Sequence, residues 1–450
     1  MSYPNVNKCI IKIVGLLGVY EEKARVDFQR KLLKENNYFE EYRPEILKVS
    51  DSFSLDPAEI LKDQYYPEFR DIMFFKNNEN HELLCRRFVS KQIKSVSLIQ
   101  KKSGVINELP IIINQCEIFL FTDQISMFSL QIEINESNRN LIFLSDLINK
   151  CRSFDTDTND MIGDKPKKWH QWISENYLQN EKLRGEKVKA DEYSGSKFKI
   201  MTVIDCDDLN EKRDHLLYDL GTSSPLKSAA GEGDYVPHKD YYSLIMNNKV
   251  SYFNNWEALC LFDSLTVVGS GILDTPSNIN TWNYSYFRIY LFRLFFKYNL
   301  YRYNSDLHDN TIKLRNKFER FLNNYNLSHI SFNFLPNEIF NKIGEALHLD
   351  EELNTFQNRI NRISSAIQEE KQSRTNALLQ FVSVLGGLGS VKPVFDGLSL
   401  AQKYLGWSNW LFYTLLVIIL LGIGIGILAF IMPEFIKKIK KIIFSKKSTL

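Results

Sequence analysis

The chain has 450 residues, of which 44% are hydrophobic and 24% are charged, a composition ordinary for a protein with a substantial folded core. The formal net charge is only +2, so no global field attracts nucleic acid and direct nucleic-acid binding is not expected. Six scattered cysteines form no CxxC pair, which favours free thiols in a reducing compartment over a disulfide framework or a zinc site.

Residues 1–271 have the pattern of a mixed α/β domain. Short apolar runs with strand character alternate with polar segments, and two helices are expected between them, at 141–150 and 169–182. The two runs at 117–122 and 126–134 are joined by a short connection and predict a β-hairpin. The expected strands are 9–20, 72–75, 88–99, 110–113, 117–122, 126–134, 198–204 and 260–268.

Two polar segments are expected to be loops. Residues 153–168 carry Asp155, Asp157 and Asp160, but the sixth position of this run is not glycine and the twelfth is Pro166, so we reject an EF-hand. Residues 222–239 are rich in Gly, Ser and Pro. The backbone N–H groups of such a loop could cradle a phosphate, with Lys227 and Lys239 as candidate ligand-binding residues, although a plain flexible loop is the commoner structure for this composition.

Residues 272–349 are expected to be helical. The stretch 284–303 is dense in aromatic residues and interleaves them with basic ones, and 310–323 predicts a second, amphipathic helix. The aromatic and basic stripe could stack a nucleotide base, with Arg288 and Arg293 as candidates. An aromatic stripe that faces the core, with a basic face in solvent, is the commoner arrangement of such a pattern.

Residues 350–376 predict a stalk helix that Asp350 can cap. No Pro or Gly interrupts 350–385, so the helix is expected to continue into the following apolar segment. Its apolar face would pack either on the chain's own domain or against a neighbouring copy. The residues of that face are Leu353, Phe356, Ile360, Ile363 and Ile367.

Residues 411–432 form an uncharged run that predicts a transmembrane helix, since at about 1.5 Å per residue it is roughly 33 Å long. The lysine-rich tail, 433–450, is expected in the cytoplasm by the positive-inside rule. The N-terminus has no pattern of a signal peptide, so a single crossing would place some 400 residues outside the cell. A second crossing resolves this conflict.

Residues 377–391 are the best candidate for that crossing, with 392–410 as a short external loop. The segment is short and marginal for a lipid-facing helix, and an interfacial or re-entrant segment is the alternative. Polar residues in membrane spans usually face a bundle interior or a cavity, which makes this helix the candidate lining of a pore. The candidate pore-lining residues are Gln380, Ser383, Gly386, Gly387, Gly389 and Ser390.

The order of these segments resembles the CorA-type divalent-cation transporter family, in which a mixed α/β cytosolic domain precedes a long helix, two spans and a lysine-rich tail. The junction Arg374–Thr375–Asn376 looks like the stalk-to-pore junction of that family. The resemblance implies a homo-oligomer, usually a pentamer, with the first span around a central pore. The family's Gly-Met-Asn signature is absent, and Phe395, Asp396 and Gly397 stand at its position, which argues against magnesium transport.

Divergent CorA-like proteins also accompany type III CRISPR systems, as membrane effectors switched on by a nucleotide second messenger, in one branch an adenylated S-adenosylmethionine. The expected function is therefore a ligand-gated pore in the inner (plasma) membrane, with both termini cytoplasmic, that disrupts the membrane in antiviral defence. No enzyme motif and no confident metal site is found, so the expectation includes no catalysis and no resident cofactor, although a divalent cation could bind. The alternatives are a magnesium or other divalent-cation transporter, and a membrane-anchored interaction protein without a pore.

Overall fold

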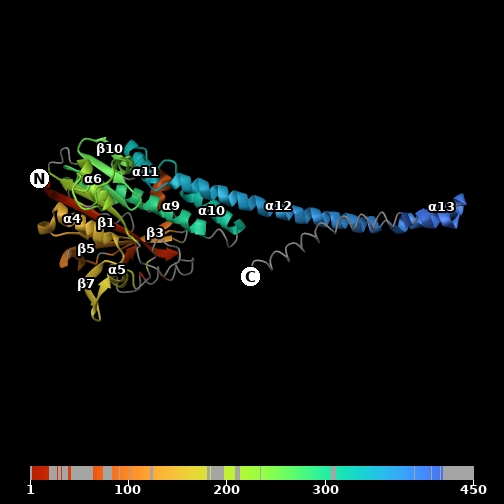
Figure 1. Ribbon diagram of the computed structural model, residues 1–450, viewed down its shortest axis with the longest axis horizontal. Helices are drawn as coiled ribbons and strands as arrows, with labels where there is room; N and C mark the ends of the chain where they lie inside the picture. Colours follow the sequence, from red (N-terminus) through yellow and green to blue (C-terminus); the bar gives the residue numbers. More distant parts are fainter. Residues whose placement is uncertain are drawn as a thin grey trace. The chain divides into compact units, whose positions relative to one another are not determined.

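The computed structural model describes residues 3–19, 28, 32, 39–41, 64–73, 84–90, 92–102, 104–121, 125–179, 183, 197–207, 213–233, 235–305, 311–389, 391–406, 408–415 and 417–418. The chain divides into two compact units, Met1–Ile360 and Asn361–Leu450. The first unit is an α+β structure built on one mixed sheet (Figure 1). The helices expected at 272–349 belong to this unit and cover part of its sheet.

The centre of the sheet is strand β1 (Val6–Val19), which pairs antiparallel with β6 (Ile125–Glu133) on one side and with β9 (Lys199–Cys206) on the other. Beyond β9 the sheet continues through β12 (Ser264–Gly269), β11 (Trp256–Cys260) and the edge strand β10 (Lys249–Phe253). The pair β9–β12 is parallel. Helix α6 (Arg213–Thr222), the exposed α7 (Lys239–Met246), β10 and β11 lie between these two strands in the sequence.

Strand β5 (Val105–Phe121) organises the other half of the sheet. One of its edges pairs with β6, which confirms the expected hairpin. Two strands pair with its other edge, one after the other: β4 (Lys94–Lys102) pairs with the first half of β5, and β3 (Cys85–Ser90) pairs with the second half. The strands expected at 110–113 and 117–122 are therefore one continuous strand. Its pairing with β6 continues through the polar residues between the two runs, with a shift in register between Ile113 and Gln115. The remaining strands are β2 (Phe39–Glu41), β7 (Asp157–Ile162) and β8 (Lys165–Lys168).

One face of the sheet, here called the α4 face, is covered by α4 (Leu141–Arg152), α5 (Trp169–Tyr177) and α6. Alternation along β1 sends Ile11 and Ile13 to this face and Ile10, Lys12 and Val14 to the other. The short helix η2 (Glu136–Asn138) leads into α4, whose N-cap Asn140 accepts a hydrogen bond from the backbone N–H of Phe143 at 2.9 Å.

The opposite face, the α9 face, is covered by α3 (Pro67–Met73), the π-helical turn η3 (Thr281–Tyr286) and α9 (Phe287–Ser305). Phe295 of α9 stacks on Phe121 of β5 at 3.8 Å between ring centroids, and Phe292 meets Phe69 of α3 edge to face at 5.4 Å. Most aromatic residues of 284–303 thus lie in the core, whereas Tyr284 and Tyr301 are half-buried. Helices α10 (Thr311–Tyr325) and α11 (Phe334–Ala346) pack on α9, and α8 (Pro276–Asn280) precedes η3.

The long helix expected from residue 350 is confirmed as α12 (Leu349–Gly389). Phe356 and Ile360 are buried in the first unit, so the start of the apolar face packs on the chain's own domain. From Asn361 to Gln380 every side chain is exposed or half-buried in the single chain. That stretch has no apolar cover of its own.

The segment 392–410 is not the loop that we expected, because most of it is helix α13 (Val391–Leu405). Its Pro393 lies in the first turn, where a missing N–H removes no helical hydrogen bond. Residues 409–415 and 417–418 are helical again, after Gly406 with φ +66°. Within the described part of the chain, none of the helices combines the length and apolarity that a bilayer crossing needs. Ser390, most of the expected span 411–432 and the tail 433–450 lie outside the described residues.

Two further expectations are wrong. Residues 72 and 73 end helix α3 and are not strand, because Pro67 starts a helical turn that buries Phe69, Ile72 and Met73 on one side. Most of the polar segment 153–168 is the hairpin β7–β8 and not a loop, because its charges pair across the strands.

Gly15 of β1 is a position where the packing admits no side chain. A Cβ atom built there overlaps the ring of Phe128 and meets Phe198 at 3.0 Å. We expect Gly15→Ala to lower the free energy of unfolding by about 1–3 kcal/mol, the usual cost of overpacking a core. Urea denaturation of the purified protein checks this, with Gly397→Ala as the control, because a Cβ atom built at Gly397 meets nothing within 4 Å. Equal stability of Gly15→Ala and wild type would contradict the packing.

Candidate functional site

The loop between α6 and α7 folds around a carboxylate of the chain itself. Asp219 of α6 is buried and accepts a hydrogen bond from the backbone N–H of Ala229 at 2.9 Å and another from that of Lys227. Gly231 and Gly233 have positive φ, as does the non-glycine residue Ser223 at +58°. Two of the amides that could cradle a phosphate thus bind Asp219. Lys227 pairs with Glu232 at 2.9 Å, and Lys239 is exposed at the start of α7.

Burial raises the pKa of Asp219 to about 6, against the opposing effect of the two N–H donors. Because the folded pKa lies above the unfolded one, the contribution of Asp219 to stability is greatest below about pH 4 and is lost as the pH rises through about 6. We expect Asp219→Asn to remove this loss, so that the variant gains about 1–2 kcal/mol over wild type at pH 7 after solvent screening is allowed for.

Urea denaturation from pH 4 to pH 8 measures that gain. The difference between variant and wild type should grow across the window and then level off above pH 6 to 7. Glu232→Gln, an exposed carboxylate of the same loop, is the control and should show no such trend. A pH-independent difference for Asp219→Asn would contradict the assignment.

The two arginines of the aromatic stripe lie inside the first unit. Arg293 lies over the ring of Phe340 at 3.3 Å and donates to its carbonyl oxygen at 3.0 Å, which places it between α9 and α11. Burial lowers the pKa of Arg293 to about 9. Arg288 donates to the carbonyl oxygen of Met73 in α3 and is almost fully buried. A nucleotide could reach either guanidinium only if a covering helix moved.

Arg288 belongs to a buried basic cluster on the α9 face, formed by Lys12, Arg87, Glu117 and Arg288. Arg87 of β3 forms an ion pair with Glu117 of β5, both nearly inaccessible to solvent. Lys12 donates to the carbonyl oxygen of Asn283 in η3 at 3.0 Å and lies 4.3 Å from the ring centroid of Phe287. Burial, followed by the charges of Arg288 and Arg87, lowers the pKa of Lys12 well below its ordinary value.

A second group of charges spans the edge of the sheet where β9 and β12 begin. Asp263, in the turn between β11 and β12, accepts from Arg152 at the end of α4 at 2.9 Å and from Lys199 of β9. Burial raises the pKa of Asp263, but these two cations outweigh burial and lower it overall. Arg152 comes from the α4 face and Lys199 from the α9 face, so the turn joins the two faces.

The neighbouring Phe262 continues this contact to the root of α12. Its ring lies 3.9 Å from the ammonium of Lys199 and 5.4 Å from that of Lys297 in α9. Lys297 donates at 2.5 Å both to the carboxylate of Glu352 in the first turn of α12 and to the carbonyl oxygen of Leu347. We call Arg152, Lys199, Phe262, Asp263, Lys297 and Glu352 the Asp263 cluster.

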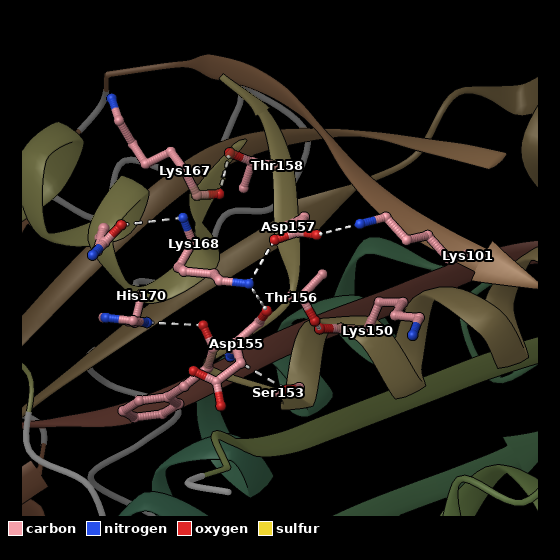
Figure 2. A network of polar contacts seen from close by, with 12 residues as sticks. Lys101, Lys150, Ser153, Asp155, Thr156, Asp157, Thr158, Lys167, Lys168 and His170 are labelled. Atoms are coloured by element: carbon pink, nitrogen blue, oxygen red, sulfur yellow. Dashed lines mark hydrogen bonds and ion pairs between the residues drawn. The ribbon is translucent and has the colours of Figure 1, made fainter. Parts of the chain in front are cut away.

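The acidic run that invited an EF-hand comparison is bound by lysines instead (Figure 2). Asp157 accepts from Lys168 at 2.6 Å and from Lys101 at 3.0 Å, and these contacts join β7 to β8 and β4. Asp160 pairs with Lys167 at 2.7 Å. Among the described residues, no group of three or more His, Cys, Asp or Glu side chains is placed to hold a metal ion.

A glycine-containing loop after β12 is organised in the same way as the loop around Asp219. Asp205, fully buried at the end of β9, accepts hydrogen bonds from the backbone N–H groups of Gly271 at 2.9 Å and Leu273 at 2.7 Å. Burial raises the pKa of this carboxyl. These amides therefore hold a side chain of the chain itself.

The pore candidates lie in the second unit. Gln380 is exposed on α12, and Ser383, Gly386, Gly387 and Gly389 lie in the last turns of the same helix. Phe395, Asp396 and Gly397 lie in the first half of α13. Phe395 meets Phe412 edge to face at 5.6 Å, and Phe412 is buried although it is the second residue of the expected span 411–432.

Sequence reasoning missed most of the Asp263 cluster. One signal was available, because Lys199 and Lys12 are single charges inside apolar runs that predict central strands. A lysine in that position must be paired or desolvated, so it marks a buried polar site. The partners Arg152, Asp263 and Glu352 are distant in sequence and carry no local signal. No family model, curated protein or solved structure matches this chain.

Proposed function

We propose that this protein is a ligand-gated, oligomeric membrane effector in which binding on the α+β unit moves α12 and opens a path through the membrane. The observation that supports it most is the continuity of α12, which begins with side chains buried in the first unit and runs unbroken to Gly389. A helix transmits a displacement of its base along its length because its backbone hydrogen bonds keep it stiff. Any movement of its first turns therefore reaches the pore candidates.

Exposed apolar side chains in the second unit support contact with lipid or with other copies. Large side chains such as Leu378, Leu379 and Trp410 are exposed in the single chain, Trp410 at 75%. Further exposed apolar side chains in the same unit include Leu400 and Ile418, and lipid or another copy would remove them from water. The polar stretch of α12 from Asn361 also lacks cover, and an isolated helix of that length is marginally stable in water. Association of several copies around α12, as in a pentamer, would cover this stretch and the exposed apolar side chains.

We place the activating ligand at the loop 223–239 and not at the aromatic stripe. Arg288 and Arg293 are covered by helices, whereas Lys227 and Lys239 lie at the surface, Lys227 half-buried and Lys239 exposed. Tyr235 of the same loop is 70% exposed and offers an aromatic face on which a base can stack. A nucleotide second messenger such as adenylated S-adenosylmethionine fits this combination of cations and exposed aromatics.

Flux of ions from liposomes tests the proposal. Full-length protein is reconstituted with a trapped fluorophore and exposed to adenylated S-adenosylmethionine, with binding measured on the same sample by calorimetry. Ligand-dependent release is the expected result. Binding without release would overturn the gated pore, and a stable monomer in detergent would favour a membrane anchor without a pore.

Gly387→Leu should suppress ligand-dependent flux roughly tenfold or more, because a bulky apolar residue narrows and dewets a path that this helix lines. Binding of the ligand should be unchanged. Asn376→Leu, which adds the same side chain to the same helix before the expected span, is the matched control and should conduct normally. Equal flux through Gly387→Leu and wild type would exclude α12 as the lining.

A further inference from the structure

The Asp263 cluster lies between the proposed ligand loop and the first turn of α12. Arg152 donates to the hydroxyl of Ser223 and to the carbonyl oxygen of Thr222 at 3.3 Å, so its guanidinium holds the start of the loop. The same guanidinium binds Asp263 at 2.9 Å through its other terminal nitrogen. One rigid, planar group therefore fixes the loop and the β11–β12 turn relative to each other.

The turn is in contact with α9 as well. Asp263 also binds Lys199, and the ring of Phe262 lies within cation–π distance of Lys199 and Lys297. Lys297 is nearly inaccessible to solvent and binds Glu352. Buried charged contacts are sensitive to small displacements, because a buried charge that loses part of its pairing has no water to replace it.

We propose that Arg152 is a positioning residue that couples the conformation of the loop 223–239 to the docking of the first turns of α12, through Asp263, Phe262 and Lys297. This inference rests on the proposed function, since it assigns the route by which a ligand at the loop reaches the stalk. Ser223 is the residue of the loop at which this route begins. Its positive φ is costly for a non-glycine residue, so a bound ligand that relaxes the backbone there withdraws its hydroxyl from Arg152.

Coupling of this kind requires more than a chain of neighbours, because spatial intermediacy alone does not show that two sites share free energy. A double-mutant cycle supplies that evidence. Ser223→Ala removes one partner of Arg152 at the loop. Arg152→Lys keeps the positive charge for Asp263 but lacks the planar fork that reaches both sides.

The readout is hydrogen–deuterium exchange of the backbone amides of residues 353–360, measured on the full chain without ligand. Ser223→Ala should accelerate exchange there by about two- to thirtyfold, the range of coupling along a contact network. In the Arg152→Lys background the same substitution should have no further effect. Ser224→Ala is the matched control, since the hydroxyl of Ser224 bonds that of Thr222 at 2.8 Å, whereas Arg152 donates to the hydroxyl of Ser223.

Exchange at 353–360 that is unchanged by Ser223→Ala, or changed equally in both backgrounds, would overturn the coupling. Faster exchange confined to the loop would overturn it as well. The liposome assay distinguishes this result from failure of the proposed function. If Ser223→Ala changes exchange at 353–360 but liposomes show no ligand-dependent flux, the coupling through Arg152 holds and the pore is ruled out. If flux depends on the ligand but exchange shows no coupling, the pore holds and the role of Arg152 is ruled out.

Discussion

Glu117→Ala is expected to lower the free energy of unfolding by about 3–5 kcal/mol, the usual cost of breaking a buried ion pair from one side. Glu117 and Arg87 are 2% and 1% exposed, so no water can replace the lost partner. The penalty is increased by the surroundings, since Arg288 brings a further positive charge to the same face of the sheet. The guanidinium of Arg288 lies 5.5 Å from the ring of Phe119, and that of Arg87 lies 5.9 Å from it.

Equilibrium urea unfolding followed by circular dichroism measures this effect. Glu133→Ala is the matched control, because Glu133 is an exposed carboxylate on β6 of the same sheet and its removal should change stability by no more than about 0.5 kcal/mol. A loss of under about 1 kcal/mol for Glu117→Ala would show that the cations of this cluster do not depend on its charge.

The long-period features of the fold were predictable from the sequence. The 3–4 spacing of Phe356 and Ile360 and the absence of Pro and Gly predicted α12, and the close apolar runs at 117–122 and 126–134 predicted the β5–β6 hairpin. The secondary structure of polar segments was harder to predict. The run 153–168 looked like a loop because its strands are stabilised by Lys–Asp pairs and not by apolar alternation, so the hydrophobic pattern carried no signal.

The candidate site was predictable only in part. Composition predicted a loop over residues 222–239, and a loop does join α6 to α7, but nothing local showed that Asp219 would bind its amides. The basic residues of the aromatic stripe were visible, whereas their partners were not. Phe340 and Glu352 meet Arg293 and Lys297 only because α11 and α12 fold back on α9, which is a tertiary effect.

Phe356→Ala is expected to detach the first turns of α12 from the helices beneath them. The ring of Phe356 is fully buried, edge to face with Phe318 at 4.5 Å and 6.0 Å from Tyr303. Truncating a buried phenylalanine costs about 3–5 kcal/mol, and here the cost falls on the docking of one helix. Local opening should therefore precede global unfolding, with amides of 353–360 exchanging about a hundredfold faster or more.

The same variant separates sensing from gating. Because Phe356 lies in the helical layer and not in the loop 223–239, the variant should still bind the ligand, with its affinity changed only by the coupling free energy, while ligand-dependent flux from liposomes is lost. Arg359→Ala, on the exposed side of the same helix, should leave exchange and flux unchanged. Normal gating in Phe356→Ala, with exchange confirmed to be faster, would mean that the docked root of α12 does not carry the signal. The stalk would then act only as a tether, and the movement that opens the path would have to begin within the second unit.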